Sequence, residues 1–183
     1  SRVIPVARFA DCFLNPGKTI AHNGRAVTYP DIRLAVWAGG NPFAHQPETA
    51  KLSRAWQKPE TTIVIDTVWT ATARHADIVL PAQTVFEHND ITGIGTYTND
   101  GLCAMQRFID PVGEARSDYT IEQELARRLG VEAAFTEGRT EDDWIRTIYE
   151  ETRAVGLVQG TILPPFETFW PQGTVFYPRR DKD

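Results

Sequence analysis

Two glycines and an asparagine follow a short apolar run, at Gly39-Gly40-Asn41. Because glycines have no side chain, their backbone N–H groups can approach a phosphate closely, and the asparagine amide adds another donor. The segment lacks the dinucleotide fingerprint GxGxxG, and a Gly-Gly pair after a strand is also found in bare turns. It is therefore a candidate phosphate-binding turn whose interpretation depends on its surroundings.

Three polar side chains follow in the next two apolar segments. Asp66 ends the run 61–65, about 26 residues after Gly40, where dinucleotide-binding folds keep an acid for ribose hydroxyls. Thr70 could hydrogen-bond the same ligand, although both side chains are equally suited to capping the next helix. Asp77 adjoins the run 78–80, and its carboxylate could accept both the N1 and N2 donors of a guanine.

Apolar runs bounded by glycine and proline predict three buried strands, at 32–37, 61–65 and 78–80. A helix opened by Pro47 and ended by Pro59 would place Leu52, Ala55 and Trp56 inward. Strands that alternate with helices predict a Rossmann-like, doubly wound α/β fold with a mainly parallel sheet. Ligands bind such sheets at the carboxyl ends of the strands, where the turn and both acids are predicted to meet.

The remaining segments complete the predicted architecture. Residues 1–30 suggest a brief helix at 6–14 and a turn-rich hairpin within the same domain. Residues 31–155 form the predicted dinucleotide-binding domain, and the proline-rich residues 156–183 an extended arm.

Inside that domain, residues 86–116 show no clear period and are interpreted as a long structured excursion. Ser117 is a predicted N-cap for a helix that stops at Gly130, and Thr140 with Asp143 forms a capping pair for another helix.

Composition excludes several classes of protein. A net charge of −5 with scattered basic residues argues against binding a long nucleic acid, and no apolar run reaches the roughly 18 residues of a membrane span. Cys12 and Cys103 have no CxxC neighbour and are expected to be buried apolar residues. His75 with Asp77, and His88 with Asp90, lack a third ligand, so no metal is assigned to side chains. GxSxG, Walker and HExxH motifs are absent from the sequence.

A series of segments carries a family resemblance. Trp-x-Gly-Gly-Asn-Pro-Phe at 37–43, Trp-Thr-Ala-Thr-Ala-Arg-His-Ala-Asp-Ile-Val-Leu-Pro at 69–81 and Glu-x-Asn-Asp-Ile at 87–91 come in a fixed order. The series continues at 114–119, 135–138 and 166–170. Together these segments resemble the molybdopterin oxidoreductases that reduce dimethyl sulfoxide, trimethylamine N-oxide and biotin sulfoxide, over nearly the whole chain.

The resemblance implies a domain that holds one of the two molybdopterin guanine dinucleotides of a molybdenum bis(molybdopterin guanine dinucleotide) cofactor. The glycine turn and Asn41 would contact the diphosphate or ribose, and Asp66, Thr70 and Asp77 the guanosine. Three further residues near these segments are weaker candidates, namely His45, Arg74 and His75.

The resemblance also implies a parent enzyme that transfers an oxygen atom with two electrons from an S-oxide or N-oxide. Its serine ligand to molybdenum is expected in an earlier part of the chain, since Ser1, Ser53 and Ser117 lie in no matching context. The chain alone is therefore not expected to be catalytic. Its expected partners are the remaining domains of the parent and a small oxide substrate, with self-association of the isolated piece. A periplasmic parent is expected, with the cytoplasm as the alternative.

Two other functions stay open. A nicotinamide-binding module would share Gly40 and Asp66 but would leave the segment at 76–81 unexplained, and a non-catalytic interaction domain could keep the fold without a cofactor. Asp77→Ala is predicted to weaken retention of a guanine dinucleotide far more than of an adenine one. Molybdenum in the full-length gene product would argue against the interaction domain.

Overall fold

The computed structural model describes residues 3–95 and 97–178 and divides the chain into two compact units, residues 1–82 (the first unit) and 83–183 (the second unit). Each unit has a sheet and a hydrophobic core of its own. The structure therefore divides the predicted domain of residues 31–155 after residue 82, and it groups residues 1–30 with the first part.

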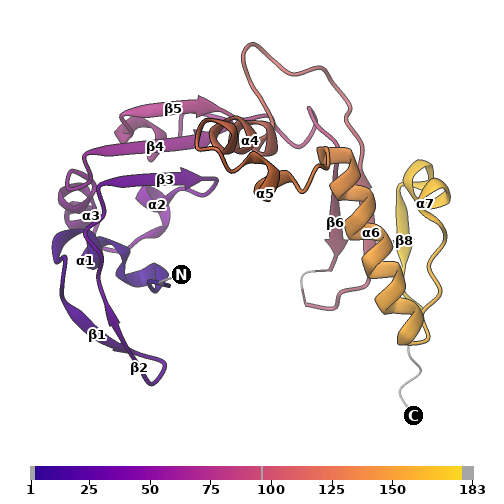
Figure 1. The fold of residues 1–183 in the computed structure, drawn as a ribbon, viewed down its shortest axis with the longest axis horizontal. Helices are drawn as coiled ribbons and strands as arrows, with labels where there is room; N and C mark the ends of the chain where they lie inside the picture. The colour runs from indigo at the N-terminus through magenta and orange to yellow at the C-terminus, as the bar shows by residue number, and fades with distance from the viewer. Residues whose placement is uncertain (1–2, 96, 179–183) are drawn as a thin grey trace. The chain divides into compact units, whose positions relative to one another are not determined.

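The first unit is built on a parallel sheet of three strands in the order β3-β4-β5, namely Leu34–Ala38, Thr61–Asp66 and Ile78–Pro81 (Figure 1). These strands lie close to their predicted positions, and their parallel pairing confirms an α/β architecture. Their order follows the sequence in one direction, whereas a doubly wound sheet reverses direction at a switch point.

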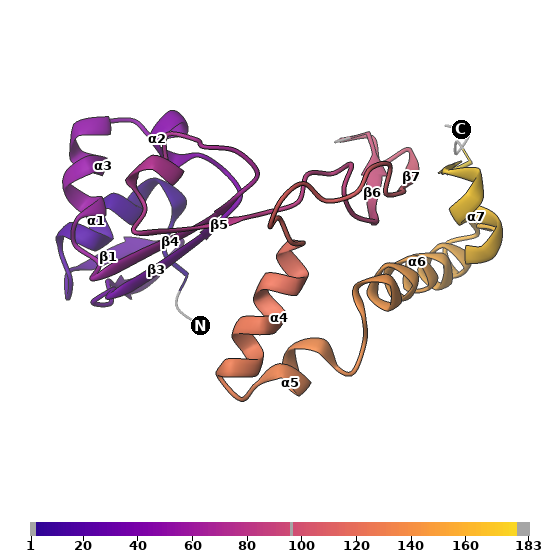
Figure 2. The ribbon, with the colours of Figure 1, turned by 90° about the horizontal axis from the view of Figure 1, so that it is seen from above.

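Helices cover one face of this sheet (Figure 2). They are α1 (Phe9–Leu14, after the 3-10 turn η1, Val6–Arg8), α2 (Pro42–His45) and α3 (Thr49–Trp56). As predicted, α3 buries Leu52, Ala55 and Trp56, two of which pack against Val64 of β4 in the core. The opposite face carries the exposed side chains of Leu34 and Val36.

Two short strands, β1 (Thr19–His22) and β2 (Arg25–Thr28), pair antiparallel and confirm the predicted hairpin. Cys12 of α1 is buried as expected, whereas Cys103 in the second unit is only partly buried, and both are free thiols.

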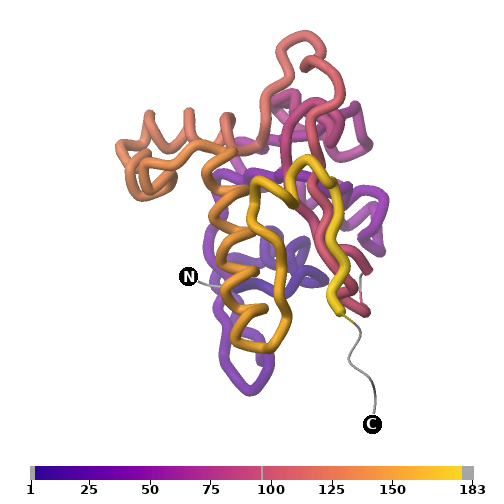
Figure 3. Tube along the Cα trace, turned by 90° about the vertical axis from the view of Figure 1, so that its right-hand side faces the viewer, coloured from indigo at the N-terminus to yellow at the C-terminus, as the bar shows by residue number. Residues whose placement is uncertain are grey.

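The second unit contains an antiparallel sheet of β6 (Asp90–Ile94), β7 (Gly101–Met105) and β8 (Thr174–Phe176). The long helix α6 (Glu141–Val158) and α7 (Phe166–Gln172) pack with this sheet around Tyr149, whose ring stacks on Phe169 at 4.2 Å between centroids (Figure 3). The predicted extended arm from residue 156 is therefore wrong in part, because it contains α7 and the strand β8.

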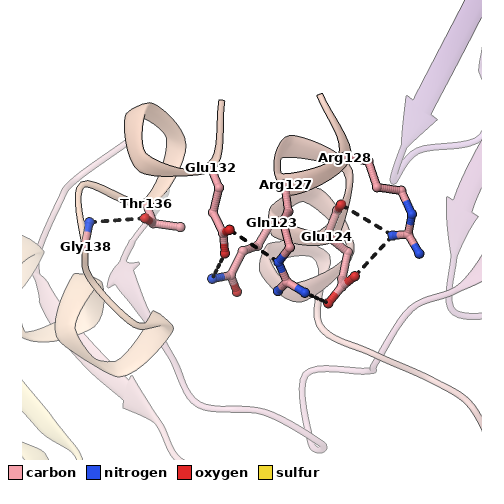
Figure 4. Close-up of polar contacts among 7 residues, drawn as sticks. All are labelled: Gln123, Glu124, Arg127, Arg128, Glu132, Thr136 and Gly138. Carbon is pink, nitrogen blue, oxygen red and sulfur yellow. Dashed lines mark hydrogen bonds and ion pairs between the residues drawn. The ribbon is translucent and has the colours of Figure 1, made fainter. Parts of the chain in front are cut away.

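The predicted helix caps of the second unit are confirmed. The Ser117 hydroxyl accepts a hydrogen bond from the Thr120 N–H at the start of α4 (Asp118–Arg128), and Thr140 and Asp143 form a reciprocal capping box at the start of α6. Arg127 pairs with Glu124 on α4 and with Glu132 on α5 (Glu132–Thr136), which ties the two helices together (Figure 4). No described helix is long and apolar enough to cross a membrane.

Candidate cofactor-binding site

The Gly39-Gly40-Asn41 turn follows β3 directly, at the carboxyl edge of the parallel sheet. Gly39 and Gly40 have φ angles of 64° and 72°, a left-handed conformation that other L-residues adopt only with strain. The Gly39 N–H donates to the Ile65 carbonyl oxygen at 3.1 Å, so the turn is fixed to the end of β4. The glycines therefore give a backbone turn without side chains at the edge where the sequence predicted it.

Asn41 is held by hydrogen bonds from two directions. Its side-chain Oδ1 accepts from the Thr72 hydroxyl at 2.7 Å and from the Thr72 N–H at 3.3 Å. Its own N–H donates to Nε2 of His45 at 3.1 Å, so the imidazole of the predicted site residue His45 already occupies this backbone donor. A ligand atom that used the Asn41 N–H would have to displace His45.

Asp66 ends β4 at the same edge. Its Oδ1 accepts from the Thr67 N–H and its Oδ2 from the Thr70 hydroxyl, both at 2.8 Å, and the Thr70 hydroxyl also accepts from the Ala73 N–H at 3.1 Å. Each carboxylate oxygen has two lone pairs, so both retain capacity for one further donor. Thr70 therefore holds Asp66 in place while Asp66 keeps acceptors for a ligand.

Asp77 lies at the opposite edge of the sheet, and its predicted position at a carboxyl end is wrong. It precedes β5, and its Oδ2 accepts from the N–H and the hydroxyl of Thr62, at 2.8 and 2.9 Å, near the start of β4. These hydrogen bonds, that from the Thr62 N–H first, hold the pKa of Asp77 below its ordinary value. Four residues separate Thr62 from Asp66, which is about 13 Å along a strand. The structure therefore separates Asp77 from the glycine turn and Asp66.

The two remaining predicted residues lie on the 3-10 turn η2 (Ala73–His75). The Arg74 side chain donates from Nε to the Trp69 carbonyl oxygen at 3.3 Å. The His75 ring stacks on Phe43 with 3.9 Å between centroids, and it lines a pocket of about 480 Å³ that Asp77 also lines. His75 therefore contacts α2, which follows the glycine turn, and also lines the pocket that Asp77 lines.

Comparison with known proteins identifies the family of this chain. The family model described as molybdopterin oxidoreductase matches residues 7–128. The chain belongs to the molybdopterin oxidoreductase family. The matched range includes the complete parallel sheet and both of its edges.

Similar curated members of the family are oxide reductases by name. The chain is 52% identical over 175 residues to a dimethyl sulfoxide/trimethylamine N-oxide reductase of Cereibacter sphaeroides, covering 96% of this chain and 21% of that protein. It is 52% identical over 171 residues to a biotin sulfoxide reductase of the same organism, covering 93% and 23%. A trimethylamine-N-oxide reductase of Vibrio cholerae is 47% identical, covering 94% and 21%. The chain thus spans about a fifth of the length of these relatives.

Among solved structures, the acetylene hydratase of Pelobacter acetylenicus has a similar fold, with a TM-score of 0.62 and 20% sequence identity. The match covers 84% of this chain and 19% of that protein. At this identity the likeness concerns the fold alone.

A polar pocket in the second unit of this molybdopterin oxidoreductase chain was not predicted from sequence. It measures about 280 Å³ and is lined in part by His88, Ser117 and Glu141. Nδ1 of His88 is buried and has no hydrogen-bond partner in the part of the chain that the structure describes. Desolvation by burial raises the pKa of Glu141. Residues 87–91 are one of the segments that resemble the family, but the pocket forms only where they meet the starts of α4 and α6 in the folded chain.

Proposed function

We propose that the first unit holds the nucleotide end of one molybdopterin guanine dinucleotide at the carboxyl edge of its parallel sheet. The observation that carries the proposal is the meeting of the glycine turn and Asp66 at the ends of neighbouring strands, joined by the Gly39–Ile65 hydrogen bond. Backbone and amide donors suit a diphosphate, and carboxylate acceptors suit the N1 and N2 donors of guanine or the ribose hydroxyls. The residues present therefore fit both chemical ends of a guanosine diphosphate group.

Each residue has a defined task in this site. Gly39 and Gly40 allow close backbone approach of the diphosphate, and the Asn41 amide donates to one of its oxygens or to the ribose. Asp66 accepts from the guanosine and Thr70 keeps its carboxylate in place. When the ligand binds, one of its oxygen atoms replaces Nε2 of His45 as the acceptor for the Asn41 N–H.

Two predicted residues, Asp77 and His75, are left out of the proposed site. Asp77 is held at the amino edge by Thr62, and the His75 ring is stacked on Phe43 with its Nδ1 at 2.7 Å from the Ala71 carbonyl oxygen. Arg74, whose N–H donates to the Thr70 carbonyl oxygen at 3.1 Å, is kept as a source of positive charge for the diphosphate.

We further propose that the parent protein is a molybdenum-dependent S-oxide or N-oxide reductase, as the names of its relatives indicate. Its cofactor would be molybdenum bis(molybdopterin guanine dinucleotide), which supplies the two-electron oxygen-atom transfer. The residues of this chain position one dinucleotide, and the other domains of the parent provide the metal ligand and substrate funnel. The exposed apolar face and the free edge of β3 support a doubly wound sheet completed by those domains.

Nucleotide binding to the 183-residue chain tests the proposal. Isothermal titration calorimetry should show tighter binding of guanosine diphosphate than of adenosine diphosphate. Asp66→Asn replaces one acceptor by a donor, and we expect it to weaken guanosine diphosphate binding by roughly tenfold to a hundredfold.

Asp77→Asn is the matched control at the opposite edge and should leave the affinity for guanosine diphosphate unchanged. Equal affinities for both nucleotides in the wild-type chain, or a loss caused by Asp77→Asn alone, would contradict the proposed site. Preferential binding of NAD would favour a nicotinamide-binding module.

A further inference from the structure

Thr72 links the two segments that form the carboxyl-edge site. Its side chain has no exposed surface, and its hydroxyl lies between Asn41 and the backbone N–H of Phe43. Thr72 is 31 residues from Asn41 in sequence and belongs to the segment that precedes η2. It lies within the segment 69–81 that resembles the family, but it was not among the predicted site residues.

The hydrogen bonds at Thr72 fix which way the Asn41 amide points. A backbone N–H can only donate, so the atom of Asn41 that faces the Thr72 N–H at 3.3 Å must be an acceptor, which is Oδ1. The Thr72 hydroxyl accepts from the Phe43 N–H at 3.3 Å and therefore directs its single hydrogen to the same Oδ1 at 2.7 Å. A flipped amide would place its NH2 group against the Thr72 N–H.

From this geometry we infer that Thr72 is a positioning residue that holds the Asn41 NH2 group outward, as a donor for anionic oxygens. The inference rests on the proposed function for the identity of the ligand, a diphosphate. With Oδ1 held by Thr72, the Asn41 NH2 group forms no hydrogen bond among the described residues and keeps its two hydrogens for a ligand. Without the Thr72 hydroxyl, only the longer hydrogen bond from the backbone N–H, at 3.3 Å, would hold the amide in this orientation, and only the nitrogen of the amide attracts a phosphate.

The neighbouring Thr70 performs the complementary task. Its hydroxyl donates to Asp66 at 2.8 Å and so holds an acceptor, whereas the hydroxyl of Thr72 holds a donor. Two threonines that are two residues apart thus hold Asn41, which follows β3, and Asp66, which ends β4. Thr62, a buried threonine that donates to Asp77 at the opposite edge of the sheet, offers a matched control for any substitution of Thr72.

The first test uses the ligand-free chain and measures the orientation of the amide by NMR. In the wild-type chain the Asn41 side-chain NH2 protons should give no strong nuclear Overhauser effect to the Thr72 backbone N–H. Thr72→Val should shift or broaden the Asn41 NH2 resonances, and Thr72→Ser should restore them because it keeps the hydroxyl. A strong effect between those protons in the wild-type chain would overturn the inference even if Thr72→Val did not fold.

The second test uses inorganic pyrophosphate as the probe. Thr72→Val should weaken its binding by roughly twofold to tenfold, the range for the loss of one hydrogen bond, because only the 3.3 Å bond from the backbone N–H then orients the Asn41 amide. Thr72→Ser should bind as the wild type does, and Thr62→Val, at the opposite edge of the sheet, should leave pyrophosphate affinity unchanged. Full pyrophosphate affinity in a folded Thr72→Val variant would overturn the inference.

The two tests separate the positioning role from the proposed function. If the wild-type chain binds neither pyrophosphate nor guanosine diphosphate while the NMR signals respond as expected, the positioning role stands and the proposed function fails. If both ligands bind and Thr72→Val leaves the Asn41 resonances unchanged, the proposed function stands and the positioning role fails.

Discussion

Replacing each glycine of the turn by alanine tests the backbone conformation and the site together. Gly39 and Gly40 have φ angles of 64° and 72°. The left-handed conformation costs a residue with a Cβ about 1–2 kcal/mol, and the gain from a stiffer unfolded chain offsets about 0.4–1 kcal/mol of this. We therefore expect Gly39→Ala and Gly40→Ala each to lower the free energy of unfolding by about 1 kcal/mol.

The surroundings of the two glycines predict equal costs. A Cβ on Gly39 would meet nothing within 4 Å, and one on Gly40 would lie 3.4 Å from Nε1 of Trp37, an ordinary contact. Neither methyl group is therefore crowded in the folded chain. For a unit of 60–100 residues, a loss of about 1 kcal/mol lowers the melting temperature by roughly 4–8 °C.

Thermal unfolding followed by circular dichroism, and titration with inorganic pyrophosphate, measure the two effects. The added methyl groups should weaken pyrophosphate binding by roughly tenfold, because they keep the ligand from the backbone of the turn. Gly130→Ala is the matched control, since Gly130 has a φ of 72° and open space around it at the end of α4 in the second unit. It should cost similar stability and leave pyrophosphate binding unchanged.

Two results would refute this reasoning. Unchanged or increased stability of Gly39→Ala and Gly40→Ala would show that the turn is not left-handed. Lower stability with full pyrophosphate affinity would show that the turn does not receive the ligand through its backbone.

Three further predictions address other parts of the chain. Asp77→Asn and Thr62→Val should each lower the melting temperature of the first unit, because they break the hydrogen bonds between β4 and the start of β5. In calorimetry both variants should keep the wild-type affinity for guanosine diphosphate. Glu87 is buried, and hydrogen bonds from Thr84 and from the Val112 N–H hold its pKa below the ordinary value. The ionised Glu87 carboxylate therefore contributes its full stabilisation above about pH 4.3, the ordinary pKa of a glutamate, and loses it as pH falls through the lower pKa of the folded chain. The melting temperature of Glu87→Gln, measured over the same pH range, should not show this loss of stability. The isolated chain should self-associate at high concentration through the sheet face that exposes Leu34 and Val36. Replacing both residues by threonine should reduce the self-association seen in light scattering. A monomeric wild-type chain at every concentration would contradict this prediction.

The elements that the sequence predicted well depend on neighbouring residues. The caps at Ser117 and at Thr140 with Asp143 form between residues three apart, and the inward face of α3 follows from helical spacing. Because these interactions join residues that are close in sequence, the pattern of residue types is sufficient to predict them.

The elements that the sequence missed depend on distant partners. β7 pairs with β8, so Gly101 lies opposite Phe176, and the β6 strand has a glycine where alternation of apolar residues would mark a strand. The tail was predicted as an extended arm because its prolines disfavour regular structure. Its short strand is stabilised by a partner that sequence spacing does not reveal.

The site shows the same division. Gly39, Gly40 and Asp66 were placed at one edge of the sheet from the sequence, because each follows an apolar run and therefore lies at a strand end. Thr72 was not, because its role depends on a tertiary contact with Asn41. A threonine before a short helical turn has the same appearance whether its hydroxyl caps the turn or reaches another segment.

Asp77 shows how one residue of offset reverses an assignment. In a parallel sheet every strand begins at one edge and ends at the other, so an acid before a strand and an acid after a strand lie on opposite edges. Asp66 ends β4 beside the glycine turn, whereas Asp77 precedes β5 and uses its Oδ2 to join β5 to the start of β4. Both acids lie in segments that resemble the family, so resemblance alone does not separate a ligand contact from a strand connection. Their positions at opposite edges of the sheet do separate them, and on that ground we propose Asp66, at the edge of the glycine turn, for the guanosine.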